Sequence, residues 1–213
     1  MLLTRKDLDL IQRNLARFDE VREEILNLSR VATRLSGSSI LEIHRGDLKT
    51  ASTSLQQVEK ALAKIDELCR DYAELRASQG VIVAFQEFVE ATTLRTYVER
   101  KRIPALKEVR SDPRSYVLGL LDVVGEFRRM TLNSLRKGQV EKAEKLLELM
   151  EGIYEDLQSL EHTAIVPTFR VKMDSARRII EATRGDVVTE VRRYSLEKAL
   201  SRLENRLGSR SGG

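Results

Sequence analysis

Four acidic residues lie in the two most apolar segments of this sequence, at spacings that suit metal chemistry. Glu87 and Glu90 are three residues apart, and Asp122 and Glu126 are four residues apart. Either spacing places both side chains on one face of a helix. Carboxylate oxygens are ligands that Mg²⁺ prefers, with Mn²⁺ as a substitute, and such a metal activates water and stabilises charge on a phosphoryl oxygen. The two pairs therefore indicate metal-dependent cleavage of a phosphodiester.

Basic side chains are scarce on the helix faces that would carry these acids. Of the four, only Glu126 has a cation within one turn, Arg129. If the two segments pack together, four carboxylates converge, and their repulsion then requires a compensating cation. Two interpretations stay open here. The acids hold a divalent metal, or Arg and Lys side chains of other helices make salt bridges to them and the acids are structural.

Basic residues follow each acidic pair along the chain. The region 95–110 carries a net charge of +4, and further arginines follow Glu126. Such cations suit the phosphates of a nucleic acid, although they also suit solvated helix ends. The candidate nucleic-acid-binding residues are Arg95, Arg100, Lys101, Arg102, Arg128 and Arg129, together with His44 and Arg45 in a predicted polar turn.

The composition favours a helical protein that works inside the cell. The 213 residues are 41% hydrophobic and 33% charged, with 11 Gly, 3 Pro and a net charge of +4. A single cysteine, Cys69, and two histidines exclude a disulfide framework and a multi-histidine metal centre. Because no apolar run approaches the roughly 20 residues that cross a bilayer, and the N-terminus is unlike a signal peptide, we expect a soluble, cytoplasmic protein with no membrane role.

Steps of three and four between apolar residues predict six or seven helices and no strand. The predicted helices cover residues 4–35, 48–75, 81–100, 114–135, 140–160 and 167–183, with a weaker one over 186–207. Breaks are expected at 37–39, 45–47 and 184–185, where glycines lie. The helices over 81–100 and 114–135 are apolar on most faces, so they should be buried and should position the acids.

These helices predict one all-α domain, a bundle over residues 1–207, with a disordered tail over 208–213. Gly119 and Gly125 flank Asp122 in the predicted helix over 114–135. Lacking a side chain, each would allow another backbone or a substrate to come close.

In these residues the sequence resembles the translin family, over about residues 17–195. The strongest motifs are 85–91 (FQEFVEA) and 116–129 (YVLGLLDVVGEFRR), and segments 172–174 and 184–186 also fit. The short loops resemble the prokaryotic, archaeal branch. The resemblance implies an all-helical fold whose subunits assemble into closed shells, usually of eight, that bind single-stranded RNA or DNA.

The resemblance also implies an activity. In translin-associated factor X, four acids of the two motifs carry a Mg²⁺-dependent endoribonuclease activity, and the matching positions are Glu87, Glu90, Asp122 and Glu126. Translin lacks the complete set and binds RNA without it. The resemblance therefore implies a homo-octameric endoribonuclease acting on single-stranded RNA. A non-catalytic single-stranded RNA- or DNA-binding protein, whose acids are structural, and a helical adaptor that binds only protein are the alternatives.

Overall fold

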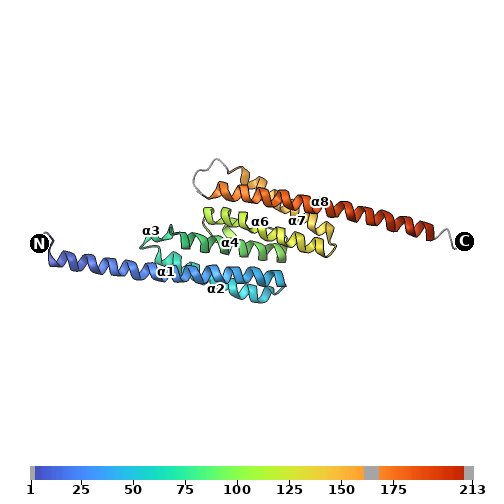
Figure 1. The fold of residues 1–213 in the computed structure, drawn as a ribbon. Helices are drawn as coiled ribbons and strands as arrows, with labels where there is room; N and C mark the ends of the chain where they lie inside the picture. Colours follow the sequence, from blue (N-terminus) through green and yellow to red (C-terminus); the bar gives the residue numbers. More distant parts are fainter. Residues whose placement is uncertain (1–2, 161–167, 209–213) are drawn as a thin grey trace. The chain divides into compact units, whose positions relative to one another are not determined.

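Every regular element in the described part of the protein is a helix. The computed structural model describes residues 3–160 and 168–208, and within them lie eight helices and no strand (Figure 1). The helices are α1 (Arg5–Arg45), α2 (Leu48–Leu68), α3 (Ala73–Arg76), α4 (Gln79–Arg100), α5 (Leu106–Val109), α6 (Pro113–Arg136), α7 (Val140–Gln158) and α8 (Phe169–Gly208). The predicted all-α class is confirmed. The chain divides within α6 into two compact units, Met1–Leu120 and Leu121–Gly213.

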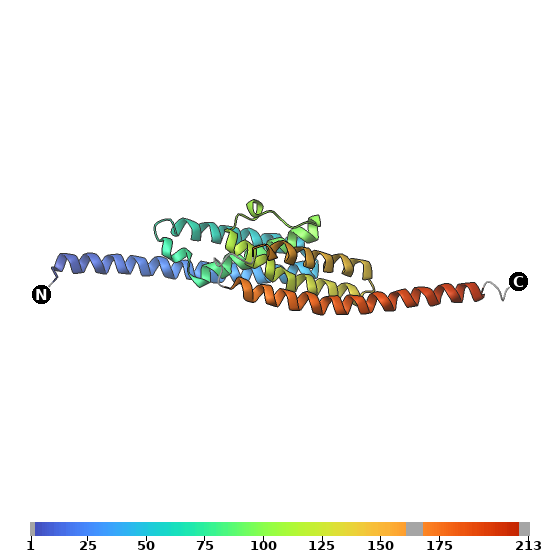
Figure 2. The ribbon, with the colours of Figure 1, turned by 90° about the horizontal axis from the view of Figure 1, so that it is seen from above.

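The first unit is built around three long helices. Helix α1 packs along both α2 and α4, and α2 also contacts α4 (Figures 1 and 2). The apolar residues that recur every three or four positions in α1 and α2 form the buried faces of these helices. Buried side chains on those faces include Val21, Ile25, Ala32, Ile40, Leu55, Val58, Leu62 and Ile65.

Helix α4 is buried on most of its faces, as its nearly continuous apolar sequence predicts. Ten of its 22 residues are buried. The first part of α6 approaches α4 closely at Gly119. A Cβ atom added to Gly119 would lie 2.6 Å from Cβ of Val89 and 2.7 Å from the backbone oxygen of Gln86. The expected close approach at this glycine is therefore present, and the group that approaches it is helix α4.

The second unit contains the rest of α6 with α7 and α8. Helices α7 and α8 pack together, and side chains of α6 bond to α8. The core is apolar and is supplied by all three helices. Its buried members include Val123, Val124, Phe127, Ala143, Leu146, Met150, Met173, Ala176 and Ile180.

Two predicted breaks are wrong, because the helices continue through them. Helix α1 runs past Gly37 to Arg45 and ends where Gly46 takes φ 86°. The hydroxyl of Ser39 donates to the backbone oxygen of Leu35, 2.9 Å away, so this serine is satisfied inside the helix. Gly185 likewise lies within α8. A glycine inside a helix costs only about 1 kcal/mol relative to alanine, and long packed helices absorb that cost.

Other helix boundaries also differ from the predictions. Helix α2 ends at Leu68 rather than near residue 75, and the short α3 and α5 were not predicted. Most of the predicted C-terminal tail, residues 209–213, lies outside the described residues. None of the helices that the structure describes is both long and apolar enough to cross a membrane.

Candidate functional site

The α6 acids are half-buried and already have a cation beside them. The side chains of Asp122 and Glu126 are 25% and 22% exposed. Lys172, in the first turn of α8, donates from Nζ to Oδ1 of Asp122 in a short ion pair. Nη1 of Arg129 lies 3.9 Å from Oε2 of Glu126. Each of the two α6 carboxylates therefore has a basic side chain of the second unit close to it.

The α4 acids lie deeper in the first unit. Glu90 is 8% exposed and is the one charged side chain among the buried residues that the structure describes, while Glu87 is half-buried. Glutamate is rarely buried to this degree unless it is paired. Both acids therefore lie on α4 at the predicted spacing, and Glu90 is buried.

The structure places the two acidic pairs in different units, Glu87 and Glu90 in the first and Asp122 and Glu126 in the second. In the described residues, no group of three or more His, Cys, Asp or Glu side chains is arranged to hold a metal ion. The convergence of all four acids stays a prediction.

The α6 pair by itself has the donor chemistry that Mg²⁺ uses. That ion is usually bound through one or two carboxylates and keeps several waters, so it needs no closed protein cage. Asp122 and Glu126 supply two carboxylates one helical turn apart, and the ammonium of Lys172 shows that Asp122 attracts a cation. A Cβ atom at Gly125, between them, would meet nothing within 4 Å in the described chain. These residues therefore fit a hard divalent cation.

Two of the predicted phosphate-binding arginines are engaged inside the first unit. Arg95 of α4 is half-buried, with Nη1 3.4 Å from the Ser52 hydroxyl and Nε 3.4 Å from Oε1 of Glu99. Arg102 makes a two-pronged ion pair with Glu108, at 2.7 and 2.6 Å. Both arginines hold protein structure in place.

Their neighbours in the sequence remain at the surface. Arg100 is the last residue of α4, and Lys101 follows it as the C-cap with φ 56°, in the left-handed region that L-residues rarely adopt. Both residues are exposed. Nζ of Lys101 lies 5.4 Å from the centre of the Tyr97 ring. The end of α4 thus presents two adjacent cations.

The connector after α4 is braced by polar contacts. The Glu108 carboxylate accepts from the backbone N–H of Ala105 at 2.7 Å, and the Tyr116 hydroxyl donates to the backbone oxygen of Pro104 at 2.7 Å. The hydrogen bonds from Arg102, and then that from Ala105, lower the pKa of Glu108 to about 2. Glu108 therefore keeps its charge, and its hold on Arg102, in mild acid.

In the second unit, Arg128 is also engaged. Its guanidinium donates to the Thr183 hydroxyl at 2.7 Å and lies 3.0 Å from Oδ2 of Asp186 on α8. Arg129, by contrast, is exposed. Of these two predicted phosphate ligands, Arg129 alone projects to the surface.

His44 and Arg45 lie in the last turn of α1, not in the polar turn that the sequence predicted. His44 is half-buried and Arg45 is exposed. The turn itself begins one residue later, at Gly46, and Asp47 caps α2 by accepting from the backbone N–H of Thr50 at 3.0 Å.

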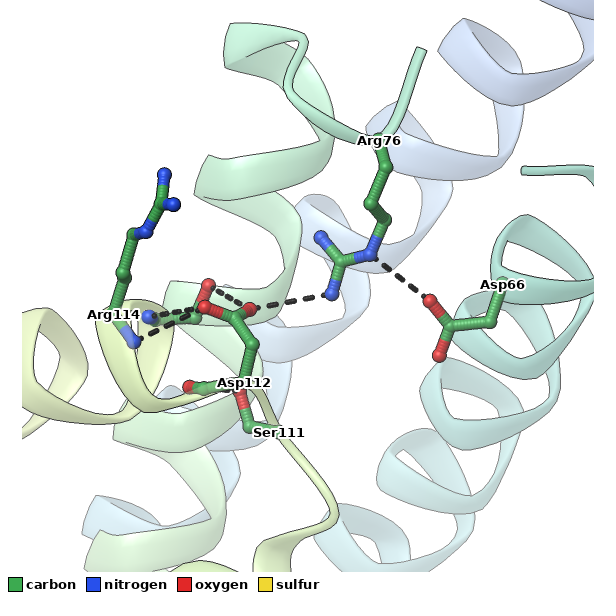
Figure 3. Close-up of polar contacts among 6 residues, drawn as sticks. Asp66, Arg76, Ser111, Asp112 and Arg114 are labelled. Carbon is green, nitrogen blue, oxygen red and sulfur yellow. Dashed lines mark hydrogen bonds and ion pairs between the residues drawn. The ribbon is translucent and has the colours of Figure 1, made fainter. Parts of the chain in front are cut away.

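Sequence reasoning missed one polar cluster that anchors the start of α6. Figure 3 shows Arg76 between two carboxylates, with Nε 3.0 Å from Oδ1 of Asp66 and Nη2 3.2 Å from Oδ2 of Asp112. Asp112 in turn accepts from the backbone N–H and hydroxyl of Ser115, at 3.1 and 2.7 Å. The guanidinium also stacks 3.9 Å above the centre of the Phe85 ring. No local spacing signals this cluster, because its members come from four separate segments.

Comparisons with known proteins identify the family of this chain. The family model described as the Translin family matches residues 20–182. An uncharacterised protein of Methanocaldococcus jannaschii is 33% identical over 207 residues, which are 96% of this chain and 91% of that protein. A translin-associated protein X homolog of Schizosaccharomyces pombe is 25% identical over 158 residues, covering 66% of this chain and 67% of that one.

Solved structures share the fold. The crystal structure of apo-NeC3PO superposes with a TM-score of 0.80 at 27% identity, over 89% of this chain and 99% of that chain. A structure of AfC3PO in complex with duplex RNA gives a TM-score of 0.77 at 30% identity, over 86% of this chain and 96% of that chain.

Proposed function

Because this chain belongs to the translin family, we propose that it is a Mg²⁺-dependent endoribonuclease that cleaves single-stranded RNA as a homo-oligomer of eight subunits. The observation that carries the proposal is the burial of carboxylates at helical spacing in the two apolar helices. Glu90 is 8% exposed, and Asp122 and Glu126 are 25% and 22% exposed. A protein that needed these positions only for solubility would leave the acids in water.

In this proposal the four acids bind the metal and the basic residues bind the phosphates of the RNA. Glu87, Glu90, Asp122 and Glu126 would hold Mg²⁺, or Mn²⁺ in its place, and orient the attacking water. When bound, the metal supplies a Lewis acid and a water of lowered pKa. The exposed cations at the end of α4 and beside Glu126 would hold phosphates and place the scissile bond against the acids.

RNA is the ligand that the comparisons favour. AfC3PO, with 30% identity to this chain, has been solved in a complex with duplex RNA. We propose that this chain binds RNA and that it cleaves single strands, as the resemblance of its two acidic motifs to those of translin-associated factor X implies. Single-stranded DNA is the other ligand expected to bind.

Self-association is supported by apolar side chains that the subunit leaves in water. The N-terminal part of α1 exposes Leu8, Ile11 and Leu15, and the C-terminal part of α8 exposes Leu196, Leu200 and Leu203. In both helices the spacing is three or four residues, so each set forms one stripe. Such stripes mark faces that another subunit covers.

One observation favours the non-catalytic alternative. Lys172 pairs with Asp122, and Arg129 lies near Glu126, so both α6 acids have protein cations nearby. In that alternative the acids are structural, and the chain binds single-stranded RNA or DNA without cutting it.

Cleavage of an end-labelled RNA separates the two functions. The wild type and Glu126→Ala are incubated with single-stranded or duplex RNA, in Mg²⁺ or in EDTA, and binding is measured in parallel. Glu141→Ala is the matched control, because Glu141 is an exposed acid on α7 of the same unit. We expect cleavage of the single strand in Mg²⁺ by the wild type and the control. Glu126→Ala should bind without cutting.

Two results would decide against a metal-dependent endoribonuclease. Cleavage that persists in EDTA would exclude the metal mechanism. Binding without cleavage by every protein in every buffer would leave a nucleic-acid-binding protein with structural acids.

A further inference from the structure

The countercharge of Asp122 comes from a distant part of the sequence. Lys172 lies 50 residues away and donates from Nζ to Oδ1 of Asp122. The two side chains are 26% and 25% exposed, so both charges are largely removed from water. A carboxylate in such a place needs a cation or hydrogen-bond donors to offset its lost hydration. Lys172 provides both in one group.

Helix stability does not account for a lysine at this position. Lys172 is the fourth residue of α8, and the first turn of α8 contains no acidic residue. The amino end of a helix carries partial positive charge, which disfavours a cation there. Arg170 in the same turn adds a second positive charge. The ion pair with Asp122 is therefore the interaction that favours a lysine here.

We infer that Lys172 is a positioning residue of the acidic site, a built-in countercation that holds Asp122 until a divalent cation takes its place. This inference rests on the proposed function, because it assumes that Asp122 is a metal ligand. Two cations on one carboxylate repel each other strongly in a partly buried site. Lys172 has a flexible four-carbon stem and is partly exposed, so its ammonium is able to leave the carboxylate.

The sign of the effect on metal affinity distinguishes this role from two others. If Lys172 competes for Asp122, removing its charge strengthens divalent-ion binding and weakens the metal-free protein. If Lys172 instead orients Asp122 as an outer-shell partner, removing it weakens binding. If the pair only joins α8 to α6, the loss of stability is the same with and without the ion.

The experiment measures Mn²⁺ binding by electron paramagnetic resonance and thermal unfolding with and without Mn²⁺, on the full chain. The variants are Lys172→Met, Lys172→Arg, Asp122→Asn and the double variant Asp122→Asn/Lys172→Met. Lys145→Met is the matched control, an exposed lysine on α7. Lys172→Arg keeps the charge and guards against a Lys172→Met protein that fails to fold.

We expect Lys172→Met to bind Mn²⁺ more tightly than the wild type, by about tenfold, because the ion no longer competes with a second cation for a partly buried carboxylate. Its metal-free form should melt at a lower temperature than the wild type, and Mn²⁺ should remove the difference. Lys172→Arg and Lys145→Met should match the wild type. The double variant should bind no more tightly than Asp122→Asn, because the competition needs the carboxylate.

Two outcomes overturn the inference, and they are distinguishable. If the wild type binds Mn²⁺ through Asp122 and Lys172→Met binds it equally or more weakly, the countercation role fails while the proposed metal site stands. If the wild type shows no Mn²⁺ binding that Asp122→Asn removes, both the inference and the proposed metal function fail.

Discussion

Arg76 and Asp112 form an ion pair with 3.2 Å between Nη2 and Oδ2, and through it α3 holds the residue that caps α6. Burial alone would raise the pKa of Asp112, but the hydrogen bonds from Ser115 and the charge of Arg76 outweigh it and hold that pKa below its ordinary value. The helix that carries Asp122 and Glu126 therefore begins at a carboxylate that stays charged.

Replacing Arg76 should destabilise the protein in a pH-dependent way. We expect Arg76→Met to lose about 2 kcal/mol of unfolding free energy at pH 7, since hydrogen bonds to charged groups contribute about 1.5–3 kcal/mol. Asp112 has a lowered folded pKa, so its contribution is complete above its unfolded value of about 3.9 and is lost as the pH falls through the folded value. Urea unfolding at pH 7 and near pH 2.5 tests this.

Arg114→Met is the control for Arg76, because it removes an exposed arginine from the same helix start. It should change the unfolding free energy little at either pH. A loss in Arg76→Met that is equally large at both pH values would contradict the role given to Asp112.

The pairing of Arg102 with Glu108 makes a prediction about one pKa. Arg102→Met should raise the pKa of Glu108 from about 2 toward its ordinary value of about 4.3, because the main cause of the shift is removed. The stabilisation that Glu108 gives is present above the ordinary value and is lost as the pH falls toward 2. Carboxyl-carbon NMR titration measures it. Lys107→Met, an exposed neighbour, should leave the pKa unchanged, and an unchanged value in Arg102→Met would refute the assignment.

The close contact at Gly119 predicts that alanine will destabilise the protein at this position but not at Gly152. Gly119→Ala should cost about 1–3 kcal/mol, because the new methyl would meet Val89 and the backbone of Gln86 at less than 3 Å. Gly152→Ala, in α7, has open space around the added Cβ and should gain about 0.5–1 kcal/mol from helix propensity. Denaturant unfolding of both variants checks the pair. Equal effects would mean that α6 and α4 separate easily at Gly119.

Lys101 should affect stability and RNA binding in opposite directions. Lys101→Gly relieves a left-handed conformation that costs an L-residue about 1 kcal/mol, so stability should rise by up to that amount. The same change removes one cation, and the slope of log affinity against log salt should fall by about 0.7 for each lost contact with single-stranded phosphate. Fluorescence anisotropy over a salt series measures the slope. Arg100→Ala should reproduce the change in slope without the gain in stability, and an unaltered slope in both would remove the end of α4 from the RNA surface.

The exposed stripe on α8 predicts how assembly fails. Leu200→Glu puts a charge among exposed leucines, so it should leave the subunit folded while lowering the mass of the assembly, because burying an unpaired charge is costly. Light scattering coupled to size exclusion measures the mass, and circular dichroism checks the helices. Val171→Glu, an exposed apolar residue in the first turn of the same helix, is the comparison. An unchanged mass in Leu200→Glu would remove this stripe from the interface.

Helix periodicity predicted most of the fold, because apolar steps of three and four are written locally in the sequence. The errors at Gly37 and Gly185 arise because glycine is a weak helix breaker when the rest of a long helix is packed. The acids were found by type and spacing. Lys172 was not found, since nothing near Asp122 in the sequence points to a partner 50 residues away. The sequence offered two indirect signs, the absence of a cation within one turn of Asp122 and the match of segment 172–174 to the family.

The first part of α1 makes amide exchange a gauge of assembly. Thr4 and Asp7 form a capping box there, yet every residue from 5 to 17 is exposed within its own subunit. Most helical stability in proteins comes from packing, so the amide hydrogens of this exposed end of α1 should exchange with solvent rapidly in a lone subunit. Neighbouring subunits that cover the stripe would slow that exchange. The N-terminal amides thus report, residue by residue, whether a subunit is alone.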